Sequence, residues 1–327
     1  MAEAIRRAFI FPGQGSQYAK MADILVHNID PKISQSSNEL FQKANRILGY
    51  DLLALCSRDP LPNELNETSY VQPAIYTTTV AALIGLAKMD KAILPSAVLG
   101  HSLGEYAALV AAGCLSFEDG LKLVQERGKL MKEAGEINPG RMAAVIRLPK
   151  DKPIEWLNGI LDEVNAKEAR EEKRVYIANY NSPSQIIIGG GEELMEEIQE
   201  KLGRKSIPLK GVSIASHTPL MKPAVEGMRN ILDEVTFNDP KIDFYQNVTG
   251  EKATTAKEIK QGLIDQLTNP VQFYKALKLI IDSGITEIVE VGPTQLLKLS
   301  GIIEKSPLGE KIELKNSDKI LSKLIGE

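Results

Sequence analysis

The chain is poor in cysteine, in histidine and in any excess of positive charge. Its 327 residues include two cysteines, Cys56 and Cys114, too few for a disulfide framework or for a zinc site made of cysteines alone. The 43 aspartates and glutamates outnumber the 39 lysines and arginines, which gives a formal net charge of −4. Because dedicated nucleic-acid-binding proteins are usually basic, we expect no nucleic-acid partner. No grouping of ligand-type residues indicates a metal site, and none is predicted.

Long hydrophobic runs are also absent. The longest apolar stretch, residues 107–115 with Gly113 counted, is shorter than the roughly 18 residues that span a membrane. Residues 1–7 contain no apolar stretch of the length that a signal peptide carries. We therefore expect a cytoplasmic protein without a membrane partner. With 43% hydrophobic and 25% charged residues, the chain has the composition of a globular protein with a sizeable core.

Strands and helices alternate along the chain, which predicts an α/β fold. Outside the middle third, the patterns predict strands at residues 7–11, 97–99, 243–246 and 287–291. They predict helices ending at residue 26 and spanning 38–48, 72–87, 105–112, 117–134, 219–235 and 270–283, and a last helix opened by Gly292-Pro293. Pro73 is placed in the first turn of its helix, and Ser116 is the predicted N-cap of the helix that follows it.

The middle third has its own pattern. Strands are predicted at residues 142–148, 175–179, 185–188 and 206–209, with helices at 153–170 and 192–202. This β-α-β-β-α-β order is typical of a ferredoxin-like unit. We therefore predict a ferredoxin-like small domain, residues 139–209, inserted into a larger domain formed by residues 1–138 and 210–327.

A candidate nucleophile lies in the segment GHSLG, residues 100–104, between an apolar strand and a helix. G-x-S-x-G in that setting is typical of a nucleophile elbow, in which a sharp turn exposes the serine at a helix N-terminus. The free N–H groups and the helix dipole there favour developing negative charge. The alternative is that Ser102 only caps a helix in an ordinary β-α turn. The setting favours the catalytic interpretation.

A serine nucleophile needs a base, and the chain offers three histidines. His27 has no motif around it, and His101 is a sequence neighbour of the serine that points elsewhere across such a turn. His217, in a Ser-His-Thr-Pro turn, is the predicted base. No acidic residue stands in a distinctive turn between Ser102 and His217, so a backbone carbonyl or a side-chain amide is expected to orient the histidine.

Two further features have functional interpretations. Arg127 precedes Gly128 inside a predicted helix, where a glycine costs about 1 kcal/mol relative to alanine and so indicates a close backbone approach. An arginine on such a helix is usually solvated, but a buried one binds carboxylates through paired hydrogen bonds. The loop around Gln14 lacks the third glycine of a dinucleotide fingerprint, because Tyr18 stands there, and fits an oxyanion-hole donor better.

Eight motifs together resemble those of the malonyl-CoA:acyl carrier protein transacylases, over residues 8–303. In chain order they are FPGQGSQ (11–17), GHSLGEY (100–106), RGK (127–129) with Met131, GRMAAV (140–145), NSP (181–183), SH (216–217), NPVQ (269–272) and EVGP (290–293). The resemblance implies a stand-alone acyltransferase of fatty acid or polyketide synthesis. It implies an α/β-hydrolase-like large domain around the ferredoxin-like insert.

The resemblance also implies a ping-pong reaction. Ser102 attacks the malonyl thioester, His217 accepts its proton, CoA leaves, and the phosphopantetheine thiol of an acyl carrier protein takes the malonyl group. Arg127 matches the arginine that pairs with the malonyl carboxylate. The remaining matched positions are the oxyanion-hole residues Gln14 and Leu103, Gln272 in the segment whose main-chain carbonyl orients the histidine, and the cleft residues Met142, Asn179 and Asn181.

Malonyl-CoA and the carrier protein are thus the expected partners of an expected monomer, with no bound cofactor. Because carrier proteins are acidic, we predict a basic docking patch on the insert from Lys173, Arg174, Arg204 and Lys205. Two other functions remain open: a hydrolase that clears misloaded acyl groups from carrier proteins, and a non-catalytic carrier-binding module. The segment IASH at 214–217 matches neither selectivity motif of modular polyketide acyltransferases, which leaves malonyl against methylmalonyl selectivity open.

Overall fold

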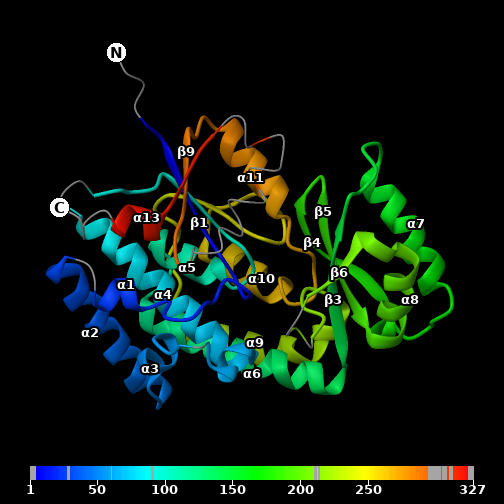
Figure 1. Ribbon diagram of the computed structural model, residues 1–327, viewed down its shortest axis with the longest axis horizontal. Helices are drawn as coiled ribbons and strands as arrows, with labels where there is room; N and C mark the ends of the chain where they lie inside the picture. The colour runs from blue at the N-terminus through cyan, green and yellow to red at the C-terminus, as the bar shows by residue number, and fades with distance from the viewer. Residues whose placement is uncertain are drawn as a thin grey trace.

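The computed structural model describes residues 5–27, 30–59, 61–89, 92–209, 212, 214–293, 303, 308 and 312–322. They form two units that lie side by side, a larger one on a six-stranded sheet and a smaller one on a four-stranded sheet (Figure 1). The predicted helix after Gly292-Pro293 lies largely outside the described residues. The α/β class predicted from the alternating pattern is confirmed.

The large sheet has the strand order β10-β9-β1-β2-β7-β8, and its five strands other than β8 run parallel. The strands are β1 (Arg7–Phe11), β2 (Ala97–Gly100), β7 (Asp243–Tyr245), β8 (Lys252–Ala253), β9 (Glu287–Glu290) and β10 (Glu313–Asn316). Phe11 and Gly100 are register partners at the carboxyl ends of β1 and β2. Loops that leave this edge of a parallel sheet build the ligand site in open α/β folds.

Helices cover both faces of the large sheet. They are α1 (Asp23–Val26), α2 (Pro31–Leu48), α3 (Leu52–Cys56), α4 (Thr68–Lys88), α5 (Gly104–Ala111), α6 (Phe117–Ile137), α9 (Lys222–Glu234), α10 (Ala256–Asp265), α11 (Phe273–Asp282) and α13 (Ser317–Ser322). Alternate side chains of β1 enter two separate cores: Phe9 and Phe11 join the core of α4, α5 and α6, whereas Ala8 and Ile10 join that of α11. Because both faces of these strands are buried, their sequences are nearly continuous runs of apolar residues.

Helix α4 is long and apolar enough to cross a membrane by length and composition, but most of it is buried inside the large unit. It is therefore a core helix. It begins at Thr68, four residues before the predicted start, so Pro73 lies inside the helix and not in its first turn. Burial on nearly all sides stabilises a helix whose proline removes one internal hydrogen bond.

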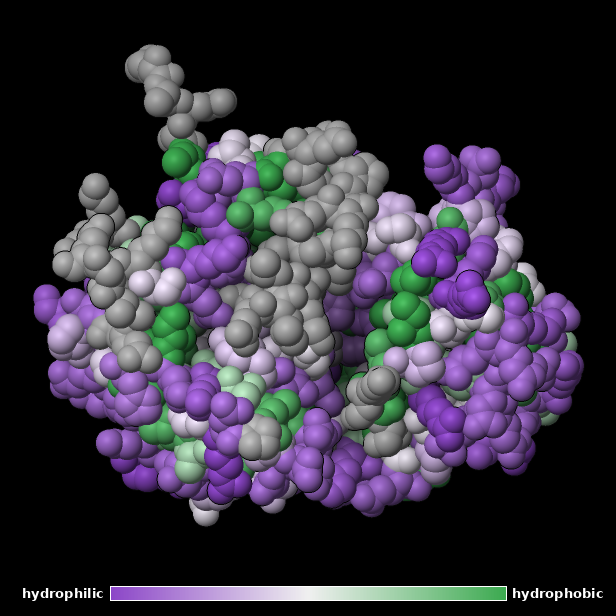
Figure 2. Space-filling view, in the orientation of Figure 1, coloured by the Kyte–Doolittle hydropathy of each residue, from purple (hydrophilic) through white to green (hydrophobic). Residues whose placement is uncertain are grey.

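The small unit contains β3 (Gly140–Ile146), β4 (Val175–Ser182), β5 (Gln185–Gly191) and β6 (Ser206–Pro208) in the antiparallel order β4-β5-β3-β6. Helices α7 (Pro153–Asn165) and α8 (Glu192–Leu202) share a core with one face of this sheet. Helix α7 ends at Asn165, five residues earlier than predicted, and the side chain of this last residue bonds both the N–H and the carbonyl of Val175. Figure 2 shows hydrophobic surface on the side of this unit that faces the large unit.

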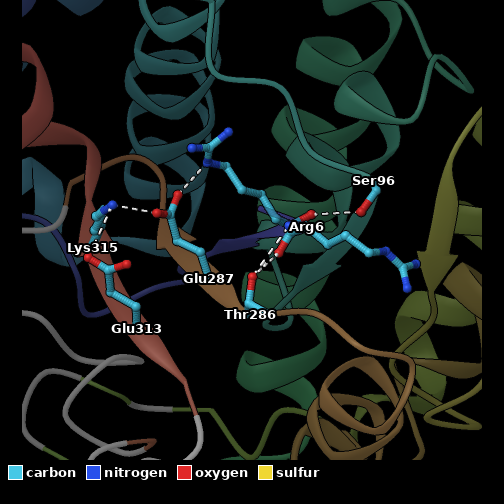
Figure 3. A network of polar contacts seen from close by, with 7 residues as sticks. Arg6, Ser96, Thr286, Glu287, Glu313 and Lys315 are labelled. Atoms are coloured by element: carbon cyan, nitrogen blue, oxygen red, sulfur yellow. Dashed lines mark hydrogen bonds and ion pairs between the residues drawn. The ribbon is translucent and has the colours of Figure 1, made fainter. Parts of the chain in front are cut away.

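Polar contacts join the two units and also join neighbouring strands of the large sheet. The backbone of Val271, in the large unit, exchanges hydrogen bonds with Ala178 and Tyr180 of β4, both 2.9 Å long. At the amino edge of the large sheet, the buried carboxylate of Glu287 pairs with Arg7 and Lys315, so that one side chain joins β1, β9 and β10 (Figure 3). This cluster lies at the amino ends of β1 and β9, whereas the loops that follow Phe11 and Gly100 lie at the carboxyl ends of their strands. The cluster can therefore be altered separately from those loops.

Candidate active site

The predicted elbow is a tight turn between β2 and α5. Ser102 has a φ of +53°, in the left-handed region that non-glycine residues rarely adopt. A Cβ atom on Gly100 would lie 2.0 Å from the amide nitrogen of Glu105, and one on Gly104 would lie 2.0 Å from the carbonyl oxygen of Phe11. Only glycine fits at either position, which explains the spacing of the motif. Strain of this kind costs of order 1–3 kcal/mol and is common at functional sites.

The structure brings Ser102 and His217 together. His217 Nε2 lies 2.7 Å from Ser102 Oγ, and His217 Nδ1 lies 2.7 Å from the carbonyl oxygen of Gln266. Because a carbonyl only accepts, Nδ1 carries the proton and Nε2 is left to accept the serine proton. Burial, helped by the charge of Arg127, lowers the pKa of His217 to about 3. The imidazole is therefore neutral at physiological pH, as a general base must be.

The carbonyl that orients His217 belongs to Gln266 and not to Gln272, so the assignment of Gln272 is wrong. The Gln272 carbonyl accepts the N–H of Ala276 at the start of α11, 3.1 Å away, and its own N–H donates to Asn247. Gln266 is the C-cap of α10, where the last carbonyls of a helix lack partners within it. The end of α10 thus supplies a free acceptor next to the histidine.

Arg127 is buried, with 2% of its surface exposed, and points at the serine from α6. Its Nη1 donates to Gln72 Oε1 at 2.8 Å, and its Nη2 donates to Gln266 Oε1 at 2.9 Å and to Ser102 Oγ at 3.2 Å. Among the described residues no carboxylate pairs with it, and its Nε–H has no partner. Burial lowers the pKa of this guanidinium, since a charge without an anion is costly there. The arrangement calls for an anionic ligand.

The close approach inferred from Gly128 is confirmed. A Cβ atom at Gly128 would lie 2.7 Å from the carbonyl oxygen of Thr68 and 3.0 Å from the Cα of Ser69. These residues open α4, so glycine lets α6 pack tightly against it and brings Arg127 to the serine.

Two backbone N–H groups are free near the nucleophile. Within the described part of the chain, the amides of Gln14 and Leu103 donate to no acceptor, whereas the Ser102 amide donates to Asn247 Oδ1 at 2.7 Å. Gln14 lines the cavity beside Ser102, and Leu103 follows the serine at the start of α5. Free N–H donors at these two positions are available to bind an oxyanion.

A cavity of about 240 Å³ lies over the serine, between the two units. Met142, Asn179 and Asn181 all line it, together with Pro12, Gly13, Gln14, Ser16, His101, Ser102, Arg127, Met131, Ala144, Gln185, Ile187, Leu209, Val212, Ile214, Ser216 and His217. His101 Nε2 is turned to Asn181 Oδ1, 2.8 Å away, and so is not directed at Ser102. His27 is largely exposed at the end of α1. No group of three or more His, Cys, Asp or Glu side chains in the described ranges is arranged to hold a metal ion.

Four polar residues of the site carried no prediction: Gln72, Glu105, Asn247 and Gln266. Asn247 closely follows β7 at the carboxyl edge, which is a usable signal, and Glu105 is an acidic residue in an otherwise apolar helix. Burial raises the pKa of the Glu105 carboxyl to about 7, although hydrogen bonds from Asn247 and Gln266 and the charge of Arg127 oppose the rise.

The basic patch predicted on the small unit is not one cluster. Lys173 and Arg174 lie beside Gly191, the N-cap of α8, whereas Arg204 and Lys205 follow its C-terminus. The 11 residues of α8 separate the two pairs by about 16 Å at 1.5 Å per residue. Lys205 instead covers the ring of Trp156, 4.6 Å from its centroid. The sequence alone does not show that the two pairs lie at opposite ends of α8.

Comparison with known proteins finds similarity over nearly the whole chain. Residues 8–305 match the acyl transferase domain family. The chain is 36% identical over 303 residues to the malonyl CoA-acyl carrier protein transacylase of Staphylococcus aureus strain MW2, covering 92% of each protein. It is 37% identical over 302 residues to the protein of the same name from Bacillus subtilis strain 168, covering 91% of this chain and 89% of that one. A solved malonyl-transacylase in complex with a type II polyketide synthase acyl-carrier protein has a TM-score of 0.84 at 31% identity, covering 97% of this chain and 98% of that one.

Proposed function

The chain belongs to the acyl transferase family and is an acyltransferase of the malonyl-CoA:acyl carrier protein transacylase type, and from this premise we propose how its residues carry the reaction. A malonyl group moves from CoA to the phosphopantetheine thiol of a carrier protein by way of an ester on Ser102. The observation that carries the proposal is the 2.7 Å contact between Ser102 and a neutral His217, beside a buried arginine with a free N–H.

Acylation begins when Ser102 Oγ attacks the thioester carbonyl of malonyl-CoA and His217 Nε2 accepts the serine proton. The carbonyl of Gln266 holds the other ring nitrogen and stabilises the imidazolium that forms. The N–H groups of Gln14 and Leu103 bind the oxyanion of the tetrahedral intermediate. The intermediate collapses when the C–S bond breaks, and the sulfur leaves as the CoA thiol with the proton from His217.

The second half of the reaction reverses these steps with another thiol. The carrier's thiol gives its proton to His217 and its sulfur attacks the malonyl ester. The ester bond breaks, and Ser102 Oγ recovers the proton from His217. One base and one oxyanion hole thus serve both halves, as a ping-pong acyl transfer requires.

Arg127 selects the acyl group by binding the malonyl carboxylate. Its Nε–H is unpartnered among the described side chains and its guanidinium lies within 3.2 Å of the nucleophile, so a carboxylate placed there orients the neighbouring thioester. Arginine donors bind a carboxylate with defined geometry, which lysine does not reproduce. Met142, Asn179 and Asn181 line the remainder of the acyl and pantetheine path.

The finer assignments are also proposals. Residues 1–138 and 210–327 form an α/β-hydrolase-like domain, supported by the elbow at the carboxyl edge of a parallel sheet. Residues 139–209 form a ferredoxin-like insert, supported by the β-α-β-β-α-β order and the antiparallel strand order. The enzyme has no resident cofactor, because the thioester and the partner's pantetheine supply the chemistry. It works as a cytoplasmic monomer.

The test is transfer of radiolabelled malonyl from malonyl-CoA to purified holo carrier protein, with free malonate counted in parallel. Label on the carrier that is lost in Ser102→Ala is the expected result. Label found mainly in free malonate would place the protein among the hydrolases and reopen the role of Arg127.

A further inference from the structure

Glu105 is a buried acid that the reaction described above does not use. It is the second residue of α5, is 1% exposed, and lies beneath the elbow. Both of its carboxylate oxygens are occupied: Oε1 accepts the backbone N–H of Asn247 at 2.8 Å, and Oε2 accepts the side-chain amide Nε2 of Gln266. Burying a carboxylate is costly unless such bonds repay it, so its place here calls for an explanation.

Gln266 joins Glu105 to the three residues of the site. Its backbone carbonyl accepts from His217, and its Oε1 accepts from Arg127 at 2.9 Å. Its Nε2 donates to Glu105 and also to the carbonyl of Ser102 at 3.2 Å. The amide therefore has one favourable orientation, with oxygen facing the guanidinium and nitrogen facing the carboxylate.

We propose that Glu105 is a positioning residue that fixes Gln266 and, through it, holds both His217 and Arg127 in place around Ser102. This inference rests on the proposed function. The acid that orients the histidine in a Ser-His-Asp arrangement contacts the imidazole directly. Here the acid acts through one intervening residue: Glu105 holds the side chain of Gln266, and the backbone of Gln266 contacts the imidazole.

Glu105→Gln tests the proposal at nearly constant volume. Both partners of Glu105, the Asn247 N–H and Gln266 Nε2, are donors. In either orientation, the amide of Glu105→Gln places its own NH₂ group against one of them. If Gln266 rotates to relieve the clash, its NH₂ group faces Arg127 instead. The substitution therefore loosens Gln266 without opening a cavity.

Pre-steady-state acylation of Ser102 is measured with malonyl-CoA and with acetyl-CoA, which has no carboxylate. We expect acylation by both donors to slow about 100-fold, the order of loss that a misplacement of about 1 Å causes. We expect KM to rise for malonyl-CoA alone, because only that donor depends on Arg127. A general loss of folded protein would not raise KM for one donor and leave it unchanged for the other.

Glu287→Gln is the matched control, since Glu287 is also a buried glutamate of the large unit but lies at the opposite sheet edge (Figure 3). It should lower the melting temperature and leave both acylation rates unchanged. Gln266→Leu removes the amide while keeping the carbonyl, and should give the same defect as Glu105→Gln. The double variant should be no worse than either single one, because both break one network.

The inference would be overturned if Ser102 of Glu105→Gln is acylated at the wild-type rate, or if the losses of the two single variants add fully in the double variant. If Glu105→Gln does not fold, wild-type acylation by folded Gln266→Leu would overturn it equally. Failure of the wild-type enzyme to label Ser102 would instead contradict the proposed function, so the two failures are distinguishable.

Discussion

Arg127→Ala separates recognition of the acyl group from the chemistry of transfer. Among the described residues, the wild-type guanidinium is buried, forms no ion pair with a carboxylate and keeps its Nε–H without a partner. A malonyl carboxylate bound there forms a buried, charge-assisted pair. Removing one partner of such a pair costs about 3–5 kcal/mol. At about 1.4 kcal/mol for each tenfold change, kcat/KM for malonyl-CoA should fall by roughly 1,000-fold.

Acetyl-CoA should respond in the opposite sense. It brings no carboxylate, so in the wild-type enzyme it leaves a buried charge unpaired, and Arg127→Ala removes that penalty. Acylation of Ser102 by acetyl-CoA should therefore be retained or increased. Arg127→Lys should also lose most malonyl transfer, because an ammonium lacks the planar arrangement of donors.

The assay is acylation of Ser102 by each donor, followed by quenching and intact-protein mass spectrometry. The informative quantity is the ratio of the two rates, which cancels any general loss of folded protein. An equal fall for both donors would refute the carboxylate role and leave Arg127 only as a support for Ser102 Oγ. Unchanged malonyl transfer would refute it outright.

The remaining predictions concern the surroundings of these residues. Gly128→Ala should lower the free energy of unfolding by about 1–3 kcal/mol, because the added Cβ would meet the backbone of α4. Gly159→Ala should raise the free energy of unfolding by up to about 1 kcal/mol, because Gly159 lies in α7 with open space around it. Urea denaturation compares the two variants, and equal effects would contradict the close approach at Gly128. Arg127→Ala should raise the pKa of His217 from about 3 toward its ordinary value, because a neighbouring positive charge disfavours protonation; an imidazole NMR titration that shows no change would contradict this.

The same pKa shift sets how stability depends on pH. The folded state holds His217 with a lowered pKa, so the unfolded state binds the proton more readily between about pH 6.5 and pH 3. The contribution of the neutral, buried His217 to the free energy of unfolding is complete above pH 6.5 and is lost as the pH falls toward 3.

Residues whose role depends on local chain geometry were predictable from the sequence. The elbow around Ser102 needs glycines at fixed spacing, and the N-cap at Ser116 needs a hydroxyl before an acidic first turn, so both leave a pattern in the letters. Gly128 indicated a close backbone approach, because a glycine lowers helix stability unless tight packing requires it. In each case the physical requirement falls on a residue type, which a sequence displays.

Residues that act through their backbone or through distant partners were not predictable in this way. Any residue at the end of α10 could offer a carbonyl to His217, so nothing in the letters distinguishes Gln266 from Gln272. The network links Gln72 to Arg127, 55 residues away, and Glu105 to Asn247, 142 residues away. In the sequence, these residues look like ordinary helix and loop residues. Helix bounds failed for a related reason: burial of α4 overrides the preference of Pro73 for a first turn.

The central claim, an acyl group carried on Ser102 and activated by His217, is tested most directly by trapping that ester. Wild-type protein, Ser102→Ala and His217→Ala are mixed with malonyl-CoA without carrier protein, quenched in acid and weighed by mass spectrometry. The account predicts one added malonyl group on the wild-type protein, located on the peptide that contains Ser102, none on Ser102→Ala and greatly slowed addition to His217→Ala. A malonyl group on Ser102→Ala, or none on the wild-type protein, would contradict it.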